Sequence, residues 1–258
     1  MIVTTTAKPS EKALEQAARL ASELHAQLKP RGNLTVRKLL TLTNDARLLV
    51  VTEREVRYYE GEAESPLYFH PSMAFVRVKR LRRGEPDPLV QLSGCLAGDH
   101  ILDCTAGLGA DSLVFSYAAG ETGSVTAIES EPVLCALVRE GLAAYETGLP
   151  DVNEAMRRIV LLNVNHLDYL KGQPDKSTDI IYFDPMFREP IHASSSMEPL
   201  RSIANMDALS PEVIEHAKRV ARKSVVLKEH QASGEFARLG FDRRHVNTSK
   251  IAYGVIEV

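Results

Sequence analysis

The chain has few cysteines and no long apolar run. Its 258 residues include only three cysteines, Cys95, Cys104 and Cys135, without zinc-binding or redox spacing. Their odd number and wide separation argue against a disulfide framework, so we expect reduced core residues. No apolar run reaches the roughly 18 residues of a membrane span. The first residues, "MIVTTTAKPSEK", lack the basic and apolar regions of a secretory signal. We therefore expect a cytoplasmic protein without a membrane segment.

An excess of positive charge is also absent. The formal net charge is −3, so no global attraction to nucleic acid exists and any basic surface must be local. The histidines show no metal-binding spacing, so we expect no metal. Hydrophobic residues make up 44% of the chain and charged residues 25%, as in soluble domains that bury a core without covalent crosslinks.

The order of expected elements indicates two domains. Residues 1–85 predict a small α/β domain with a β-branched strand at the start, then a helix capped by Ser10 whose apolar spacing continues to Leu28. Strand-like segments follow. Residues 86–258 alternate strands with helices, which predicts a Rossmann-like α/β fold with a mainly parallel sheet. Ligands of such sheets bind at the carboxyl ends of the strands.

A motif for a nucleotide-like cofactor follows the first strand of the second domain. The segment "ILDCTAGLGADS" places Asp103 at the strand end and Gly107 and Gly109 before a helix. Glycines allow a ligand to approach the backbone, and a helix start offers free N–H groups. Glu129 ends the next strand, 20 residues beyond Gly109 (129 − 109 = 20). A carboxylate at that position can accept hydrogen bonds from both hydroxyls of a ribose.

Two cofactors are compatible with this spacing. A nicotinamide dinucleotide requires a third glycine, but Ser112 stands there. It would also leave Asp103 without a function. S-adenosylmethionine (AdoMet) carries an amino acid, and Asp103 suits its ammonium group. The motif therefore favours AdoMet, with a dinucleotide or an ordinary glycine-containing turn as alternatives.

A second motif, "FDPMF", closes a later strand. It is similar to the acid–proline–proline–aromatic motif of methyltransferases that act on exocyclic amines, with Met186 in place of the second proline. The lone pair of such an amine is delocalised into its ring, so acceptors for the N–H hydrogens help the nitrogen to become tetrahedral. We expect Asp184 and the Pro185 carbonyl to be these acceptors, and Phe187 to stack on the base. An ordinary strand-terminal turn is the alternative.

Two further signals are less specific. The segment "RVKRLRR" holds five basic residues in seven, which makes Arg77, Lys79 and Arg80 candidates for contacts with RNA phosphates. An ordinary solvated face explains the segment equally simply. Lys228 ends the strand-like "VVLK" and could bind a phosphate or be a solvated terminus.

The segments "LDCTAGLGADS", "IESEPVLCALVREGL", "YFDPMF" and "VVLK" together resemble RsmJ-type 16S ribosomal RNA (guanine-N2) methyltransferases over roughly residues 70 to 230. The N-terminal third is closer to a less characterised Gram-positive branch. The resemblance implies a class I methyltransferase fold in residues 86–258, AdoMet as methyl donor, and a guanine near the 3′ end of small-subunit rRNA as target. The cofactor residues that it implies are Ala110, Asp111, Glu129, Ser130, Asn165, His166 and Asp184.

The sequence therefore predicts an AdoMet-dependent N-methyltransferase that acts on guanine N2 of 16S rRNA, either naked or in the 30S subunit. The target base must be unpaired or extruded to reach the site. Alternatives are a methyltransferase for DNA adenine or a protein amide, and an AdoMet-binding RNA assembly factor without catalysis. A nicotinamide-dependent oxidoreductase is a further alternative. The sequence leaves the oligomeric state open.

Overall fold

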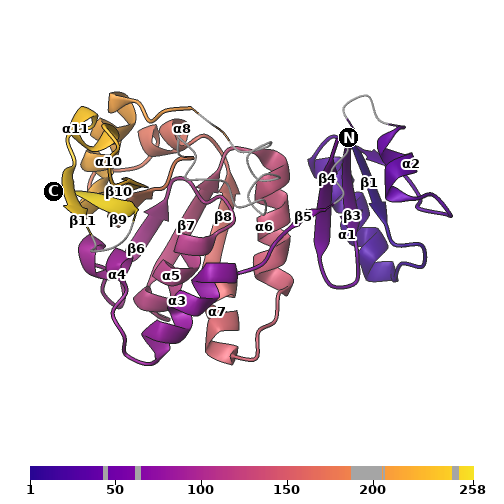
Figure 1. Ribbon diagram of the computed structural model, residues 1–258, viewed down its shortest axis with the longest axis horizontal. Coiled ribbons are helices and arrows are strands. Elements are labelled where there is room, and N and C mark those ends of the chain that lie inside the picture. The colour runs from indigo at the N-terminus through magenta and orange to yellow at the C-terminus, as the bar shows by residue number, and fades with distance from the viewer. Residues whose placement is uncertain (43–45, 62–64, 187–204, 206, 246–249) are drawn as a thin grey trace. The chain divides into compact units, whose positions relative to one another are not determined.

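The computed structural model describes residues 1–258 except 43–45, 62–64, 187–204, 206 and 246–249 (Figure 1). The described chain divides into two compact units. The first contains Met1–His70 and Pro132–Glu146, and the second contains Pro71–Glu131 together with 147–186 and the described residues from 205 onward. The boundary expected between residues 85 and 86 stays a prediction.

The first unit contains a five-stranded sheet in the order β2-β1-β3-β4-β5. β1 pairs in parallel with β2 and β3, whereas the pairs β3–β4 and β4–β5 are antiparallel. The strands are β1 (Ile2–Thr5), β2 (Gln27–Leu28), β3 (Arg47–Val51), β4 (Val56–Glu60) and β5 (Leu67–Tyr68). The strand-like segments expected after the first helix are confirmed as β3, β4 and β5.

Helices α1 (Glu11–Glu23), α2 (Val36–Leu40) and α6 (Pro132–Ala144) belong to this unit. The Ser10 side chain caps α1 by accepting a hydrogen bond from the Ala13 N–H, as predicted. The expectation that α1 continues to Leu28 was wrong. His25 takes a positive φ of 49°, which a helix cannot accommodate, and Leu28 then pairs with Val3 in the sheet. The backbone hydrogen bonds of strand pairing replace those of another helical turn.

The second unit contains a seven-stranded sheet in the order β11-β12-β10-β9-β6-β7-β8. The pairs that join β10, β9, β6, β7 and β8 are parallel, and β12 is antiparallel to both neighbours. The strands are β6 (His100–Asp103), β7 (Ser124–Glu129), β8 (Ile159–Asn163), β9 (Thr178–Phe183), β10 (Ala221–His230), β11 (Asp242–His245) and β12 (Ile251–Glu257). The Rossmann-like α/β fold is confirmed.

Helices pack along this sheet (Figure 1). α3, α5 and α7 lie side by side, with α5 against β6 and β7, while α10 packs against α8 and β10. The helices are α3 (Ser72–Arg82), α4 (Pro88–Ser93), α5 (Ala110–Ala119), α7 (Pro150–Arg158), α8 (His166–Lys171), α10 (Pro211–Val220) and α11 (Glu235–Arg238).

The core of the second unit explains why its central strands read as apolar runs. Ile180 and Ile181 of β9 and Val225 and Val226 of β10 are fully buried, and because successive residues of a strand point to opposite faces, both faces of these parallel strands are covered. All three cysteines are buried and free, which confirms the expectation of reduced core residues. None of the helices in the described residues has the length and apolar character that crossing a bilayer requires.

Candidate active site

Three predicted acids lie at one edge of the seven-stranded sheet. Asp103 is the last residue of β6, Glu129 is the last residue of β7, and Asp184 directly follows β9. β6 pairs in parallel with both β7 and β9, so the carboxyl ends of the three strands are neighbours. This is the edge at which open α/β sheets bind ligands.

The glycine loop joins β6 to α5 and is bonded to Glu129. Gly107 and Gly109 have φ values of 51° and 72°, which side chains other than glycine rarely adopt. The Gly107 N–H donates to Glu129 Oε2 at 3.0 Å, and the Glu131 N–H donates to Oε1 at 2.9 Å. Burial raises the pKa of Glu129. The Glu129 carboxylate, at the end of β7, therefore holds the glycine loop in place.

Asp103 is enclosed by the same loop. Its Oδ1 accepts a hydrogen bond from the Thr105 N–H at 3.1 Å, and its Oδ2 accepts one from the Ser112 hydroxyl. Burial raises the pKa of Asp103 to about 7. Ser112, which replaces the third glycine of a dinucleotide motif, thus uses its hydroxyl within the protein. The expected position of Asp103 beside the methionine part of AdoMet stays a prediction.

The "FDPMF" segment is attached to the cofactor motif by its backbone and by its acid. The Asp184 N–H donates to Thr105 Oγ1, in the loop after β6. Asp184 Oδ2 accepts from Lys228 Nζ at 2.7 Å, and Nζ also donates to Asp111 Oδ2 at 2.8 Å. The Asp184 side chain is 26% exposed, compared with 17% for Lys228 and 6% for Asp111. One lysine therefore joins the acid of "FDPMF" to an acid of α5.

The ion pairs continue from Asp111 to α3. Asp111 accepts from the Tyr182 hydroxyl at 2.7 Å and pairs with Arg77, whose Nε and Nη2 each lie 2.8 Å from an oxygen of Asp87. We refer to Asp87, Arg77, Asp111, Lys228 and Asp184 as the charge network. Three carboxylates alternate with two cations in it, so each cation lies between two acids.

The network sets the ionisation of its acids. Although burial opposes ionisation, Lys228 and Arg77 hold the pKa of Asp111 well below its usual value. Burial raises the pKa of Asp184 to about 6, against the opposing effect of Lys228. Burial also disfavours the Lys228 ammonium, but Asp111 and Asp184 raise its pKa above the usual value. Both acids and the lysine are consequently charged at neutral pH.

The other predicted cofactor residues lie near the ends of β7 and β8. The side chain of Asn163, which the sequence reading missed, donates to the carbonyls of Glu129 and Ser130 at 2.8 and 3.0 Å. Asn165 caps α8 by accepting from the Leu167 N–H, and the His166 ring packs edge-on against Phe183. Burial lowers the pKa of His166. Ala110 begins α5, and Pro185 follows Asp184.

The predicted substrate residues have different environments. Arg77 is engaged by two carboxylates, and Lys228 likewise, so their predicted contacts with phosphates would compete with these ion pairs. Lys79 Nζ lies 4.8 Å from the centre of the Phe75 ring, and Arg80 pairs with Glu85 at 2.9 Å. Phe187 lies outside the described residues. Contacts of all these residues with RNA stay predictions.

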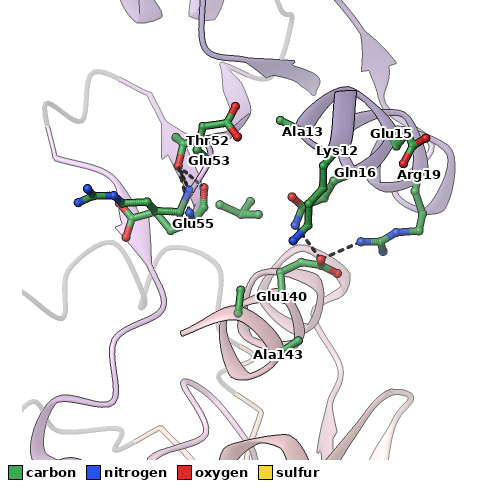
Figure 2. Close-up of a pocket in the computed structure, with 13 residues that line it drawn as sticks. Lys12, Ala13, Glu15, Gln16, Arg19, Thr52, Glu53, Glu55, Glu140 and Ala143 are labelled. Atoms are coloured by element: carbon green, nitrogen blue, oxygen red, sulfur yellow. Dashed lines mark hydrogen bonds and ion pairs between the residues drawn. The ribbon is translucent and has the colours of Figure 1, made fainter. Parts of the chain in front are cut away.

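A separate cavity of about 470 Å³ lies in the first unit (Figure 2). It is lined by α1, the turn between β3 and β4, and α6. Gln16 and Arg19 of α1 point toward Glu140 of α6 and donate to its Oε2 at 2.8 and 2.7 Å. Side chains of both charge signs line the cavity, so its charge selects neither an anion nor a cation.

A Rossmann-like sheet with a glycine loop and with acids at the carboxyl ends of its strands is typical of enzymes that bind a nucleotide-like cofactor. Residues 35–244 match the family described as "Putative SAM-dependent methyltransferase". The chain therefore belongs to this family of SAM-dependent methyltransferases, and its methyl donor is S-adenosylmethionine. The predicted family, fold and cofactor are thus confirmed. In the described residues, no cluster of three or more His, Cys, Asp or Glu side chains could hold a metal ion.

Two curated proteins and one solved structure illustrate what the chain is similar to. The chain is 41% identical over 256 residues to "Uncharacterized protein YpiP" of Bacillus subtilis (strain 168), with 99% of each protein covered. It is 34% identical over 152 residues to "Ribosomal RNA small subunit methyltransferase J" of Hydrogenovibrio crunogenus, covering 56% of this chain and 53% of that protein. The crystal structure of the SAM-dependent methyltransferase NGO1261 from Neisseria gonorrhoeae matches with a TM-score of 0.65 and 18% identity, covering 100% of this chain and 96% of that one, and shows the same fold.

Proposed function

We propose that this protein methylates an exocyclic amine of an RNA base, and specifically N2 of a guanine in 16S rRNA. The observation that carries the proposal is the attachment of the "FDPMF" acid to the cofactor motif. Thr105, in the loop after β6, accepts from the Asp184 N–H, and Lys228 connects Asp184 to Asp111 of α5. An acceptor for an amine is thereby held next to the elements that bind the methyl donor.

The residues at the sheet edge fit AdoMet. Glu129 offers a buried carboxylate for the ribose hydroxyls, and a Cβ added at Gly107 would meet no atom within 4 Å, so space beside the loop is open. Asp103 and Asp111 would flank the methionine end, with Gly109 and Ala110 at the start of α5. Ser130, Asn165 and His166 would border the adenine. When bound, AdoMet supplies a methyl group on a positively charged sulfur.

Asp184 and Pro185 would act on the target amine. The Asp184 side chain is 26% exposed, although Lys228 Nζ donates a hydrogen bond to its Oδ2. It can therefore accept a hydrogen bond from an amine N–H, together with the Pro185 carbonyl. These bonds favour the tetrahedral nitrogen whose lone pair attacks the methyl group. We propose that Phe187 stacks on the base and that positioning supplies most of the rate.

The choice of RNA as substrate rests on two features. The relative from Hydrogenovibrio crunogenus is named as a ribosomal RNA small subunit methyltransferase, and it is 34% identical to this chain over 152 residues. Lys79 and Arg80 of α3 and Arg83, which directly follows this helix, are exposed and can contact phosphates. The net charge of −3 favours a substrate recognised by shape, such as the 30S subunit.

Methyl transfer from tritiated AdoMet tests the proposal. The acceptors are naked 16S rRNA and 30S subunits, both from a strain that lacks this gene, and mass spectrometry locates the modified base. We expect one N2-methylguanosine. Incorporation only into DNA or protein, or AdoMet binding without incorporation into either RNA substrate, would contradict the proposal.

The variant Asp184→Ala tests the role of the carboxylate. We expect it to abolish transfer while AdoMet binding stays measurable by calorimetry, because the contacts at Glu129 are untouched. Glu131→Ala is a matched control, since Glu131 lies just after β7 and its hydrogen bond to Glu129 comes from the backbone N–H, which alanine keeps. Wild-type turnover by Asp184→Ala would remove this residue from the mechanism.

A further inference from the structure

Lys228 lies opposite the acid of "FDPMF" because of the register of two parallel strands. Leu227 of β10 is the partner of Phe183 of β9. Lys228 and Asp184 are the residues that directly follow this pair. Lys228 Nζ lies 2.7 Å from Asp184 Oδ2 and 2.8 Å from Asp111 Oδ2, and its side chain is 17% exposed. Its ammonium group is thus directed into the protein, between two acids.

We propose that Lys228 is a positioning residue that acts on the target amine through Asp184, an inference that rests on the proposed function. Thr105 fixes the Asp184 backbone, and Lys228 fixes one oxygen of the side chain. Two attachments leave the carboxylate little freedom to rotate. Asp111 in turn holds Lys228, and it is itself held by Tyr182 and Arg77.

The charge of Lys228 is as important as its position. Asp111 and Asp184 share this single ammonium group, and each carboxylate raises the energy of the other. Without Lys228, one of the two acids would bind a proton near neutral pH. Asp111 retains Arg77, so Asp184 would be the acid that is protonated. A protonated carboxyl has lost part of its capacity to accept a hydrogen bond from an amine.

The variant Lys228→Gln keeps a polar side chain but removes the charge. The control is Lys223→Gln, because Lys223 lies on the same strand and pairs with another buried acid, Asp99, at 2.5 Å. We expect Lys228→Gln to lower kcat about 100-fold, as misplacement of a reacting group does. The acid limb of its pH profile should move to higher pH. Lys223→Gln should keep the wild-type profile.

Lys228→Arg provides the rescue. Its guanidinium retains the charge, so the acid limb should stay at the wild-type pH, while the different geometry lowers kcat. A Lys228→Gln enzyme with the wild-type acid limb would overturn the inference. If Lys228→Gln does not fold, Lys228→Arg provides the test, and an acid limb shifted from the wild-type pH in that variant would overturn the inference.

Carbon-13 NMR of the aspartate carboxyl groups separates this inference from the proposed function. The Asp184 signal is assigned by comparison with Asp184→Asn and titrated in wild type, Lys228→Gln and Lys223→Gln. We expect a higher titration midpoint in Lys228→Gln alone, whether or not RNA is the substrate. An unchanged midpoint would refute the role of Lys228, whereas a raised midpoint without methylation of rRNA would refute only the proposed substrate.

Discussion

Arg77→Met should destabilise the protein more than an ordinary surface substitution does. Arg77 is 21% exposed and donates to both oxygens of Asp87 and to Asp111, two side chains that are each 6% exposed. Removal of one partner from a buried ion pair costs about 3–5 kcal/mol. Asp111 keeps Lys228 and Tyr182, and Asp87 keeps the N–H of Leu89 at the start of α4. We therefore expect a loss of about 3 kcal/mol, at the lower end of that range.

Urea unfolding followed by far-UV circular dichroism measures this loss. Arg80→Met is the matched control on the same helix, because the Arg80–Glu85 pair has side chains that are 52% and 40% exposed. Such an exposed pair contributes about 0–1 kcal/mol. A loss in Arg77→Met no larger than that in Arg80→Met would refute the argument that the charge network stabilises the fold.

The pH dependence gives a second test of the same variant. Arg77 helps to keep the pKa of Asp111 low in the folded state. An aspartate with a depressed folded pKa contributes stability above its unfolded pKa of about 3.9, and loses it as the pH falls toward the folded value. The difference in unfolding free energy between wild type and Arg77→Met should therefore be full at neutral pH and smaller in acid. A difference that grows below pH about 4 would contradict this assignment.

Two other substitutions test the cofactor site and the first unit. Glu129→Gln should weaken AdoMet binding about 10–100-fold in calorimetry, since a hydrogen bond to a charged group contributes about 1.5–3 kcal/mol; an unchanged Kd would remove Glu129 from the site. Gly141→Ala should lower the unfolding free energy by about 1–3 kcal/mol, because overpacking forces neighbours apart. Its new Cβ would lie 2.1 Å from Phe69 Cβ. Wild-type stability in urea would contradict this.

The sequence predicted the positions of the strand ends well. Asp103, Glu129 and Asp184 each follow an apolar run, and parallel strands bring such ends to one edge of a sheet. The expected strands and the helix after the glycines follow from local periodicity and from glycine placement. Such features depend on neighbouring residues, so one sequence is sufficient to predict them.

The partners of the acids could not be predicted in the same way. Lys228 contacts Asp111 although the two residues are 117 positions apart in the sequence, and Arg77 contacts Asp111 at a separation of 34 positions. These contacts depend on strand order and register, which no local pattern specifies. Thr105, Tyr182 and Asp87 carried no signal for the same reason. The end of α1 was missed because pairing of Leu28 with Val3 outweighed a helical spacing.

The basic segment on α3 shows how one run of charges serves different purposes. Residues two apart on a helix point in different directions, so Arg77 faces Asp87 and Asp111 while Lys79 is exposed. Arg80 is exposed as well. Arg77 consequently contributes to the stability of the second unit and helps to keep Asp111 ionised. Contacts of the exposed residues of the segment with a phosphate backbone stay a prediction. A composition-based reading assigns all five cations one role, whereas burial divides them into a structural cation and a solvent-facing group.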